Sequence, residues 1–431
     1  MLKYIAILFT GVLTSFYFFP FEFAILPGAN TKMVMAGVSL IVLGLQLAKK
    51  RSASIGRDFL ILTILAGLVS LSGLVAVSYN ETNDYTYATY IVSMWVWLGG
   101  AYLIVCCMRW LHNDVSVKLI AHYLIGVCVA QCVLALLIDA IPAFKLFVNT
   151  YVAGFDWVQF EQLEKGNRLY GIGASLDVAG LRFSAVLVMI AYICMQKEIR
   201  TDNRQIVGYL IAFCIIAIVG NMIARTTTMG VGLSLLYWMY AWYKDKESKR
   251  VWIWVVSIVC IAVFISGYLY QVNNNFREDI RFAFEGFFSL WEKGEWSVSS
   301  NDRLMNMFVF PDNTKTWLIG DGYIENPHHR DPYYIGPITG GYYMGTDVGY
   351  LRFIFYFGLI GLTFFLVFFG KVTQVCMRRF KRYGLLFLLI LSVNLIGWVK
   401  VSTDVFLVFA LFLCLSEEEN QNSENSIPQI E

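Results

Sequence analysis

An arginine and an aspartate lie where a long apolar run begins near residue 348. The stretch "TGGYYMGTDVGYLRFIFYFGLIGL" (339–362) opens with glycines, tyrosines and Asp347, and it places Arg352 inside the apolar run. An ionisable side chain within a membrane segment is costly and usually faces a partner, a cavity or a ligand. The planar guanidinium donates two parallel hydrogen bonds to phosphate oxygens. Arg352 is therefore a candidate to bind an anion.

Arg182 and Arg225 resemble Arg352 in position, because each lies toward the predicted outer end of an apolar segment. The positive-inside bias disfavours arginine on the outer side of a membrane. Several arginines at one level therefore indicate an anionic ligand at the outer face, such as a lipid pyrophosphate. Arg182 is the weaker candidate, since it can pair with Asp177 or Asp404 for structure.

The chain that must position these residues is that of an integral membrane protein. Of its 431 residues, 58% are hydrophobic and only 15% are charged, whereas a soluble globule is about half apolar and a quarter charged. We predict an all-α polytopic fold with about twelve membrane segments. They lie near 4–26, 31–48, 58–79, 88–108, 117–142, 175–196, 205–223, 226–243, 251–271, 348–370, 383–399 and 401–416. The last two are short enough to form one hairpin.

The orientation in the membrane follows from the basic connections between the predicted segments. Together with Lys3, these connections contain 19 of the 33 Lys and Arg residues. They alternate strictly with poorly basic ones such as "NETNDYT" (80–86). Basic connections stay cytoplasmic. We therefore expect both termini in the cytoplasm, including an acidic, disordered tail at 417–431. The long connections 143–174 and 272–347 are expected outside.

The 272–347 loop contains candidate helices and sugar-binding residues. "FREDIRFAFEGFFSLW" (276–291) has the spacing of an amphipathic helix lying on the membrane surface. A second short helix over 299–308 carries Arg303. The tyrosines that follow, with Tyr342 and Tyr343 among them, suit stacking on sugar rings, although an interfacial belt would look the same. No His or Cys spacing typical of a metal site occurs, so we expect neither metal nor cofactor.

Four stretches resemble the O-antigen polymerase and O-antigen ligase superfamily of polytopic membrane glycosyltransferases. "NRLYGIGASLDVAGLRFSAVLV" (167–188) is similar to its arginine-led start of a helix, and "GNMIARTTTMGVGLSLLY" (220–237) to its Arg- and Ser/Thr-containing turn. "NDRLMNMFVFPDNTKTWLIGDGY" (301–323) resembles the arginine helix of its external loop. "GTDVGYLRFIFYFGLIGL" (345–362) resembles its stretch from that loop into the next helix. Ligases typically carry a His-Asn pair here, and Asp347 in its place resembles the polymerase branch.

The resemblance implies a metal-independent, inverting transfer at the outer face of the bacterial inner membrane. The growing glycan leaves polyprenyl pyrophosphate and joins the terminal sugar of a second lipid-linked repeat unit of O-antigen, capsule or exopolysaccharide. Implied partners are this lipid-linked oligosaccharide, the bilayer, and a chain-length regulator and flippase of the same pathway, with no nucleic acid. The residues expected to bind phosphate and the donor are Arg168, Arg225, Arg303 and Arg352, and Arg182 is a weaker candidate. Asp347, His328 and His329 are the candidate general bases.

Three other functions stay open. A ligase would transfer glycan to a different lipid or to protein with the same fold. A twelve-helix transporter would normally show two repeated halves with a long middle connection, whereas the long loop here is late in the chain. A non-enzymatic glycan-binding or scaffold protein is the third alternative.

Overall fold

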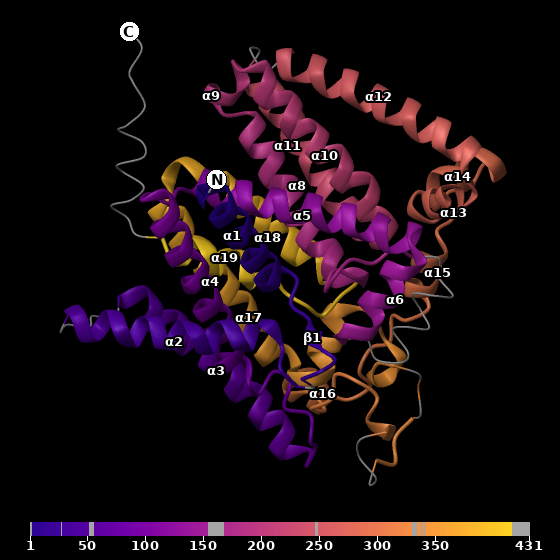
Figure 1. Ribbon diagram of the computed structural model, residues 1–431. Coiled ribbons are helices and arrows are strands. Elements are labelled where there is room, and N and C mark those ends of the chain that lie inside the picture. Colours follow the sequence, from indigo (N-terminus) through magenta and orange to yellow (C-terminus); the bar gives the residue numbers. More distant parts are fainter. Residues whose placement is uncertain are drawn as a thin grey trace. The chain divides into compact units, whose positions relative to one another are not determined.

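The computed structural model describes residues 2–26, 28–50, 56–153, 168–245, 249–329, 334–337, 339 and 341–415 (Figure 1). Each of the twelve predicted segments contains a helix. They are α1 (Leu2–Phe18), α2 (Thr31–Lys50), α3 (Arg57–Tyr79), α4 (Tyr90–His112), α5 (Val117–Ala140), α8 (Leu176–Cys194), α10 (Asn203–Ile223), α11 (Thr227–Lys244), α12 (Lys249–Val272), α17 (Gly349–Arg379), α18 (Gly384–Gly397) and α19 (Phe406–Leu413).

Eight of these helices are long and apolar enough to cross a membrane: α2, α3, α4, α5, α8, α10, α12 and α17. The protein is thus helical and of the membrane class. By contrast, α18 has 14 residues and α19 has eight, whereas crossing a bilayer as a helix takes about 20 residues. Neither can span a bilayer alone.

The chain forms two compact units, each built from separate stretches of sequence. Unit 1 contains Met1–Val38, Gly100–Trp296 and Cys414–Glu431, and unit 2 contains Ser39–Gly99 and Ser297–Leu413. Helices α2 and α4 are divided between the units. Arg168, Arg182 and Arg225 therefore belong to unit 1, whereas the other predicted site residues belong to unit 2.

In unit 1, α8 is the central helix, and every residue from Ala179 to Cys194 is buried. It packs against α5, α10 and α11, and the last two run beside it in Figure 1. Small residues permit this approach, since a Cβ added at Gly230 would lie 2.3 Å from the Cα of Ser184. The Ser184 hydroxyl accepts from the Gly230 N–H (3.1 Å) and donates to the Thr226 carbonyl (3.0 Å). Small residues and hydroxyls are typical of helix contacts in membranes.

One predicted boundary in unit 1 is wrong, and the loop after α5 contains a helix. The first helix ends at Phe18 rather than near 26, because Pro20 cannot continue it. Residues Glu22–Phe23 form strand β1 instead, paired antiparallel with β2 (Val152–Ala153). The expected loop 143–174 begins with a helix, α6 (Pro142–Tyr151), which has proline at its first position. Residues 154–167 lie outside the described part of the chain, as does the tail from 416.

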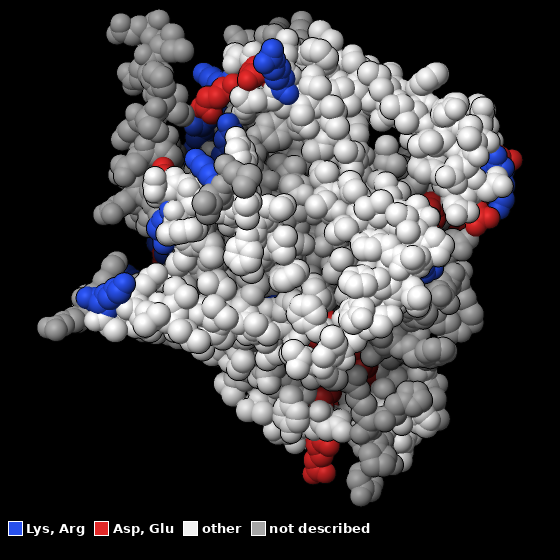
Figure 2. All heavy atoms as spheres, in the orientation of Figure 1, with Lys and Arg blue, Asp and Glu red and all other residues white. Residues whose placement is uncertain are grey.

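The predicted amphipathic helix 276–291 is two helices, α13 (Asn274–Ala283) and α14 (Glu285–Lys293), which meet at Phe284. Phe284 leaves the helical region of backbone space with φ −118° and ψ 31°. Apolar side chains of α14 remain exposed, with Trp291 at 90% and Phe287 at 60%. The surface over α12 is similarly uncharged along most of its length in Figure 2. Both observations fit contact with lipid.

In unit 2, α17 packs on α3, α18 and α19 and also on α16 (Thr314–Ile319), a short helix of the long loop. It is longer than predicted and is broken at Gly358, where φ is 67° and ψ −173°. Carbonyls before a helix break lose their intrahelical donors. Here the carbonyls of Phe355 and Tyr356 accept from the N–H groups of Asp321 (2.5 Å) and Gly322 (3.0 Å).

The turn formed by Gly320, Asp321 and Gly322 thus docks against the broken helix. Both glycines have positive φ, and a Cβ at Gly320 would lie 2.4 Å from the Tyr356 carbonyl oxygen. The end of α3 holds the other side of the turn, because Asn80 donates to the Gly320 carbonyl (3.2 Å) and Thr82 to that of Gly322 (3.0 Å). The long loop is therefore fixed to the helices at this turn.

We predict that Gly358→Ala releases this turn. A side chain at φ 67° and ψ −173° costs about 1–3 kcal/mol, and the new Cβ would lie 2.1 Å from the Leu318 carbonyl oxygen. The melting temperature of the purified protein in detergent should fall, and trypsin should cut more rapidly after Lys315. Gly370→Ala is the matched control in the same helix, because a Cβ there meets nothing within 4 Å. Equal behaviour of the two variants would contradict this packing.

Candidate functional site

Arg352 lies in the first turn of α17, and only 7% of its surface is exposed. Its guanidinium is stacked on the Tyr342 ring, with 3.6 Å between the Cζ atom and the ring centroid. Asp347 approaches it to 3.9 Å, which is longer than a hydrogen bond. The Nε atom of Arg352 is buried and finds no hydrogen-bond partner among the described residues. Such orphaned buried donors are rare in proteins, and this one makes Arg352 a candidate for ligand binding.

Asp347 and Arg352 lie closer than their spacing suggested. A separation of five residues in a helix would put them on different faces. The helix begins only at Gly349, however, so Asp347 precedes it and helical periodicity does not apply. The carboxylate therefore partly balances the charge of Arg352 while 28% of its side chain stays exposed.

The two predicted tyrosines have different surroundings. Tyr342 covers Arg352 and is held by a backbone bridge to Glu325. Tyr343 lies in a 3-10 turn, η3 (Tyr343–Gly345), and its hydroxyl donates to Oδ2 of Asp321 (3.2 Å). Burial, followed by the charge of Asp321, raises the pKa of Tyr343 above its ordinary value. Tyr343 thus anchors the docked turn, whereas Tyr342 faces the arginine.

The residues that hold this turn in place were not predicted from the sequence. The ammonium of Lys315 pairs with Asp321 (2.6 Å) and donates to Oδ1 of Asn80 (2.7 Å). Thr316 donates to the same Asp321 oxygen (2.7 Å). The signal was the Gly-Asp-Gly sequence, in which an acid between two glycines is typical of a tight turn. Its partner Asn80 lies far away in the sequence and could not have been identified.

In unit 1, Arg168 and Arg225 share the ring of Phe282, at 4.9 and 3.9 Å from its centroid. Arg225 also pairs with Glu285 (2.6 Å) and donates from Nε to the Phe282 carbonyl (2.9 Å). Burial lowers the pKa of Arg225, while the Glu285 carboxylate acts in the opposite direction. The two arginines thus lie at one aromatic ring, but much of the donor capacity of Arg225 is already used within unit 1.

The remaining predicted residues have other surroundings. Arg182 is buried in α8, with its guanidinium 5.8 Å from the Phe19 ring centroid. Arg303 is exposed on α15 (Ser299–Met305). His328 is exposed in the 3-10 turn η2 (Pro327–His329), and the side chain of His329 lies outside the described part of the structure. Among the described residues no group of three or more His, Cys, Asp or Glu could hold a metal ion.

Comparison with known proteins gives no relative. No family model, no curated protein and no solved structure matches the chain. The functional argument therefore rests on the residues and their geometry.

The buried carboxyl group of Asp279 makes the stability of unit 1 depend on pH. Asp279 lies on α13, three residues before Phe282, and is only 8% exposed. Burial first, then the charges of Asp139 and Glu278, raise its pKa from 3.8 to about 7. The folded state therefore retains a proton that the unfolded state releases between pH 4 and 7. This group's contribution to stability falls as pH rises through that window and stays low above it.

We predict that Asp279→Asn removes this loss. The variant should be more stable than wild type at pH 8, by an amount of the order of 1 kcal/mol or more, and nearly equal to it at pH 4. Thermal unfolding of the purified protein across this range measures the difference. Glu278→Gln is the control, because that side chain is exposed and should give a smaller change. A difference that does not vary with pH would contradict the titration of Asp279.

Proposed function

We propose that the protein is a polymerase of lipid-linked oligosaccharide repeat units in the bacterial inner membrane. It transfers the growing glycan from polyprenyl pyrophosphate to an acceptor repeat unit at the external face. The proposal includes twelve membrane segments, with 143–174 and 272–347 outside. The family resemblance supports it on the sequence side, and no cofactor is needed because the donor is already activated.

The observation that carries the proposal is the setting of Arg352. A guanidinium lies at the start of an apolar helix, is stacked on Tyr342 and keeps a buried Nε–H for a ligand. A lipid pyrophosphate would bring its charge to the lipid–water boundary, where this helix begins. Charge-assisted hydrogen bonds from a fixed guanidinium would then stabilise the charge that grows on the leaving pyrophosphate.

The proposed step is a displacement at the anomeric carbon of the donor glycan. The acceptor hydroxyl oxygen bonds to this carbon from the face opposite the pyrophosphate. The bond from the carbon to the phosphate oxygen breaks, its electron pair leaves with polyprenyl pyrophosphate, and the configuration inverts. The hydroxyl proton passes to a general base. Asp347 is the leading candidate, because its carboxylate lies beside Arg352 and is partly exposed.

Turnover of a purified lipid-linked repeat unit by protein in nanodiscs tests the proposal. Wild-type protein should release polyprenyl pyrophosphate and form polymer without added metal. Asp347→Asn keeps the shape of the side chain but removes the base, so we expect a rate loss of about 100-fold or more. The double variant His328→Ala/His329→Ala should polymerise at nearly the wild-type rate.

The other outcomes separate the alternatives. Loss only in the double histidine variant would move the base to that pair. Near-normal rates in both variants would mean that no side chain of this set accepts the proton. Glycan transfer only when a different lipid or a protein acceptor is supplied would identify a ligase, and no transfer by wild type under any of these conditions would refute the proposal.

A further inference from the structure

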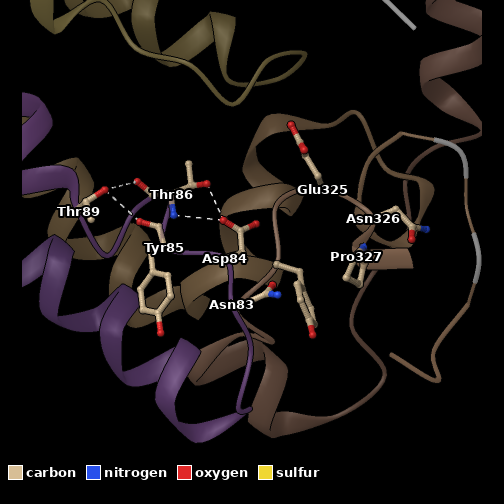
Figure 3. A pocket seen from close by; sticks show the side chains of 9 residues that line it. Asn83, Asp84, Tyr85, Thr86, Thr89, Glu325, Asn326 and Pro327 are labelled. Carbon is tan, nitrogen blue, oxygen red and sulfur yellow. Dashed lines mark hydrogen bonds between the residues drawn. The ribbon is translucent and has the colours of Figure 1, made fainter. Parts of the chain in front are cut away.

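A cavity of about 310 Å³ opens within unit 2, between the turn that follows α3 and the 323–327 segment of the long loop (Figure 3). Its volume is at the lower end of the range for small-ligand sites, roughly 300–1,000 Å³, which suits one small ring better than an oligosaccharide. The residues that supply its polar lining are Asn83, Asp84, Thr86, Tyr323, Glu325 and Asn326.

Hydrogen bonds within and between the two walls form the cavity in advance of a ligand. Oδ1 of Asp84 accepts from the N–H (3.1 Å) and the hydroxyl (2.5 Å) of Thr86, as the dashed lines in Figure 3 show. Its Oδ2 accepts from the Ile324 N–H on the opposite wall (2.9 Å). Asn326 donates to the Thr339 hydroxyl (2.6 Å). A pre-formed site avoids the cost of ordering its walls on binding.

The lining determines which ligands are compatible. It contains two carboxylates, two amides, hydroxyl groups and the aromatic ring of Tyr323, and none of its described residues is Lys or Arg. Hydroxyl groups both donate and accept hydrogen bonds, and carboxylates and amide oxygens accept from them. A tyrosine ring can stack on the apolar face of a sugar. An anionic ligand, by contrast, would face the carboxylates of Asp84 and Glu325, which repel a negative charge.

The cavity also adjoins the setting of Arg352. Glu325 forms an antiparallel backbone bridge with Tyr342, the residue whose ring covers the guanidinium. The Asn326 N–H donates to the Gly341 carbonyl (2.8 Å), and the Tyr343 N–H donates to that of Ile324 (3.2 Å). Residues opposite each other in such a bridge are roughly 5 Å apart. A sugar ring in the cavity and a phosphate at Arg352 would therefore be separated by little more than the width of the paired segments that contain Glu325 and Tyr342.

We propose that this cavity binds one neutral sugar ring of the lipid-linked substrate and excludes uronic acids. The inference rests on the proposed function for the identity of the substrate, while the binding itself can be measured without turnover.

Saturation-transfer NMR on protein in nanodiscs measures this binding, with methyl glycosides of neutral hexoses, 6-deoxyhexoses and N-acetylhexosamines as probes and methyl glucuronide as the acidic probe. At least one neutral glycoside should bind more tightly than the glucuronide. Asn83→Ala should weaken the neutral glycoside about fivefold, the effect of one lost hydrogen bond. Glu325→Gln should strengthen glucuronide binding. Both side chains are exposed, so these changes should leave the fold intact.

Glu81→Gln is the matched control, since Glu81 is exposed on the same turn but does not line the cavity. Its binding should equal that of wild type. Equal affinity for neutral and acidic glycosides, no binding of any neutral probe, or no effect of Asn83→Ala would overturn the proposal, even if the protein polymerises repeat units. Specific neutral binding that is sensitive to Asn83 in a protein without polymerase activity would sustain the site and refute the function.

A further probe shows whether the ring comes from the donor or from the acceptor. This probe is the sugar that binds, with a methyl pyrophosphate ester in place of the methyl group on its anomeric carbon. If this ester binds more than tenfold tighter than the methyl glycoside, and Arg352→Lys removes the gain, the ring belongs to the donor. If the two probes bind equally, the ring belongs to the acceptor.

Discussion

The hydrogen bonds from the Asp321 and Gly322 N–H groups to the carbonyls of Phe355 and Tyr356 fix the long loop of unit 2 to its central helix. These hydrogen bonds require a broken helix, because only a break frees those carbonyls. Gly358 breaks the helix, with a φ that other residues rarely adopt. Tyr343 and Lys315 bind Asp321 from either side of the turn. The positions of Tyr342, Asp347 and the cavity all follow from this docking.

Arg225 and Arg352 have different surroundings. In unit 1, Arg225 has a carboxylate, a carbonyl and an aromatic ring as internal partners. Such an arrangement satisfies the charge, and it fits a structural role as well as a ligand site. In unit 2, Arg352 has an aromatic ring on one face and a carboxylate beyond hydrogen-bond distance. A buried donor without a hydrogen-bond partner is costly unless a ligand accepts its hydrogen bond. Arg352 therefore supports the proposed ligand site more directly than Arg225 does.

Much of the helical framework could be predicted from the sequence, because hydrophobic runs of about 20 residues reflect the thickness of a bilayer. Local chemistry also predicted the short helix that carries Arg303. The boundaries were less predictable. The end of α1 at Phe18 depended on Pro20 and a two-residue strand pair, and the break at Phe284 leaves no mark in the apolar spacing. The continuation of α17 past its break depended on the docked turn that occupies the freed carbonyls.

The candidate site was predictable only in part. An arginine inside an apolar run is visible in the sequence, and so are nearby tyrosines. The cavity was not predictable, because Asn83 and Asp84 come from a short connection that meets Glu325 and Asn326 only in the folded chain. The approach of Asp347 to Arg352 did not follow from their spacing of five residues for a simpler reason, namely that the helix begins between them. Long-range pairing and helix starts set these distances, and neither follows from local residue patterns.

The central claim is that Arg352 binds pyrophosphate, and direct binding of a short polyprenyl pyrophosphate to protein in nanodiscs tests it. Titration calorimetry should give an affinity at least tenfold weaker for Arg352→Lys, a loss of about 1.4 kcal/mol, because lysine keeps the charge but lacks the planar fork. Arg382→Lys, in a connection predicted to be cytoplasmic, should bind as wild type does. An unchanged affinity in Arg352→Lys, with the protein folded, would contradict the account.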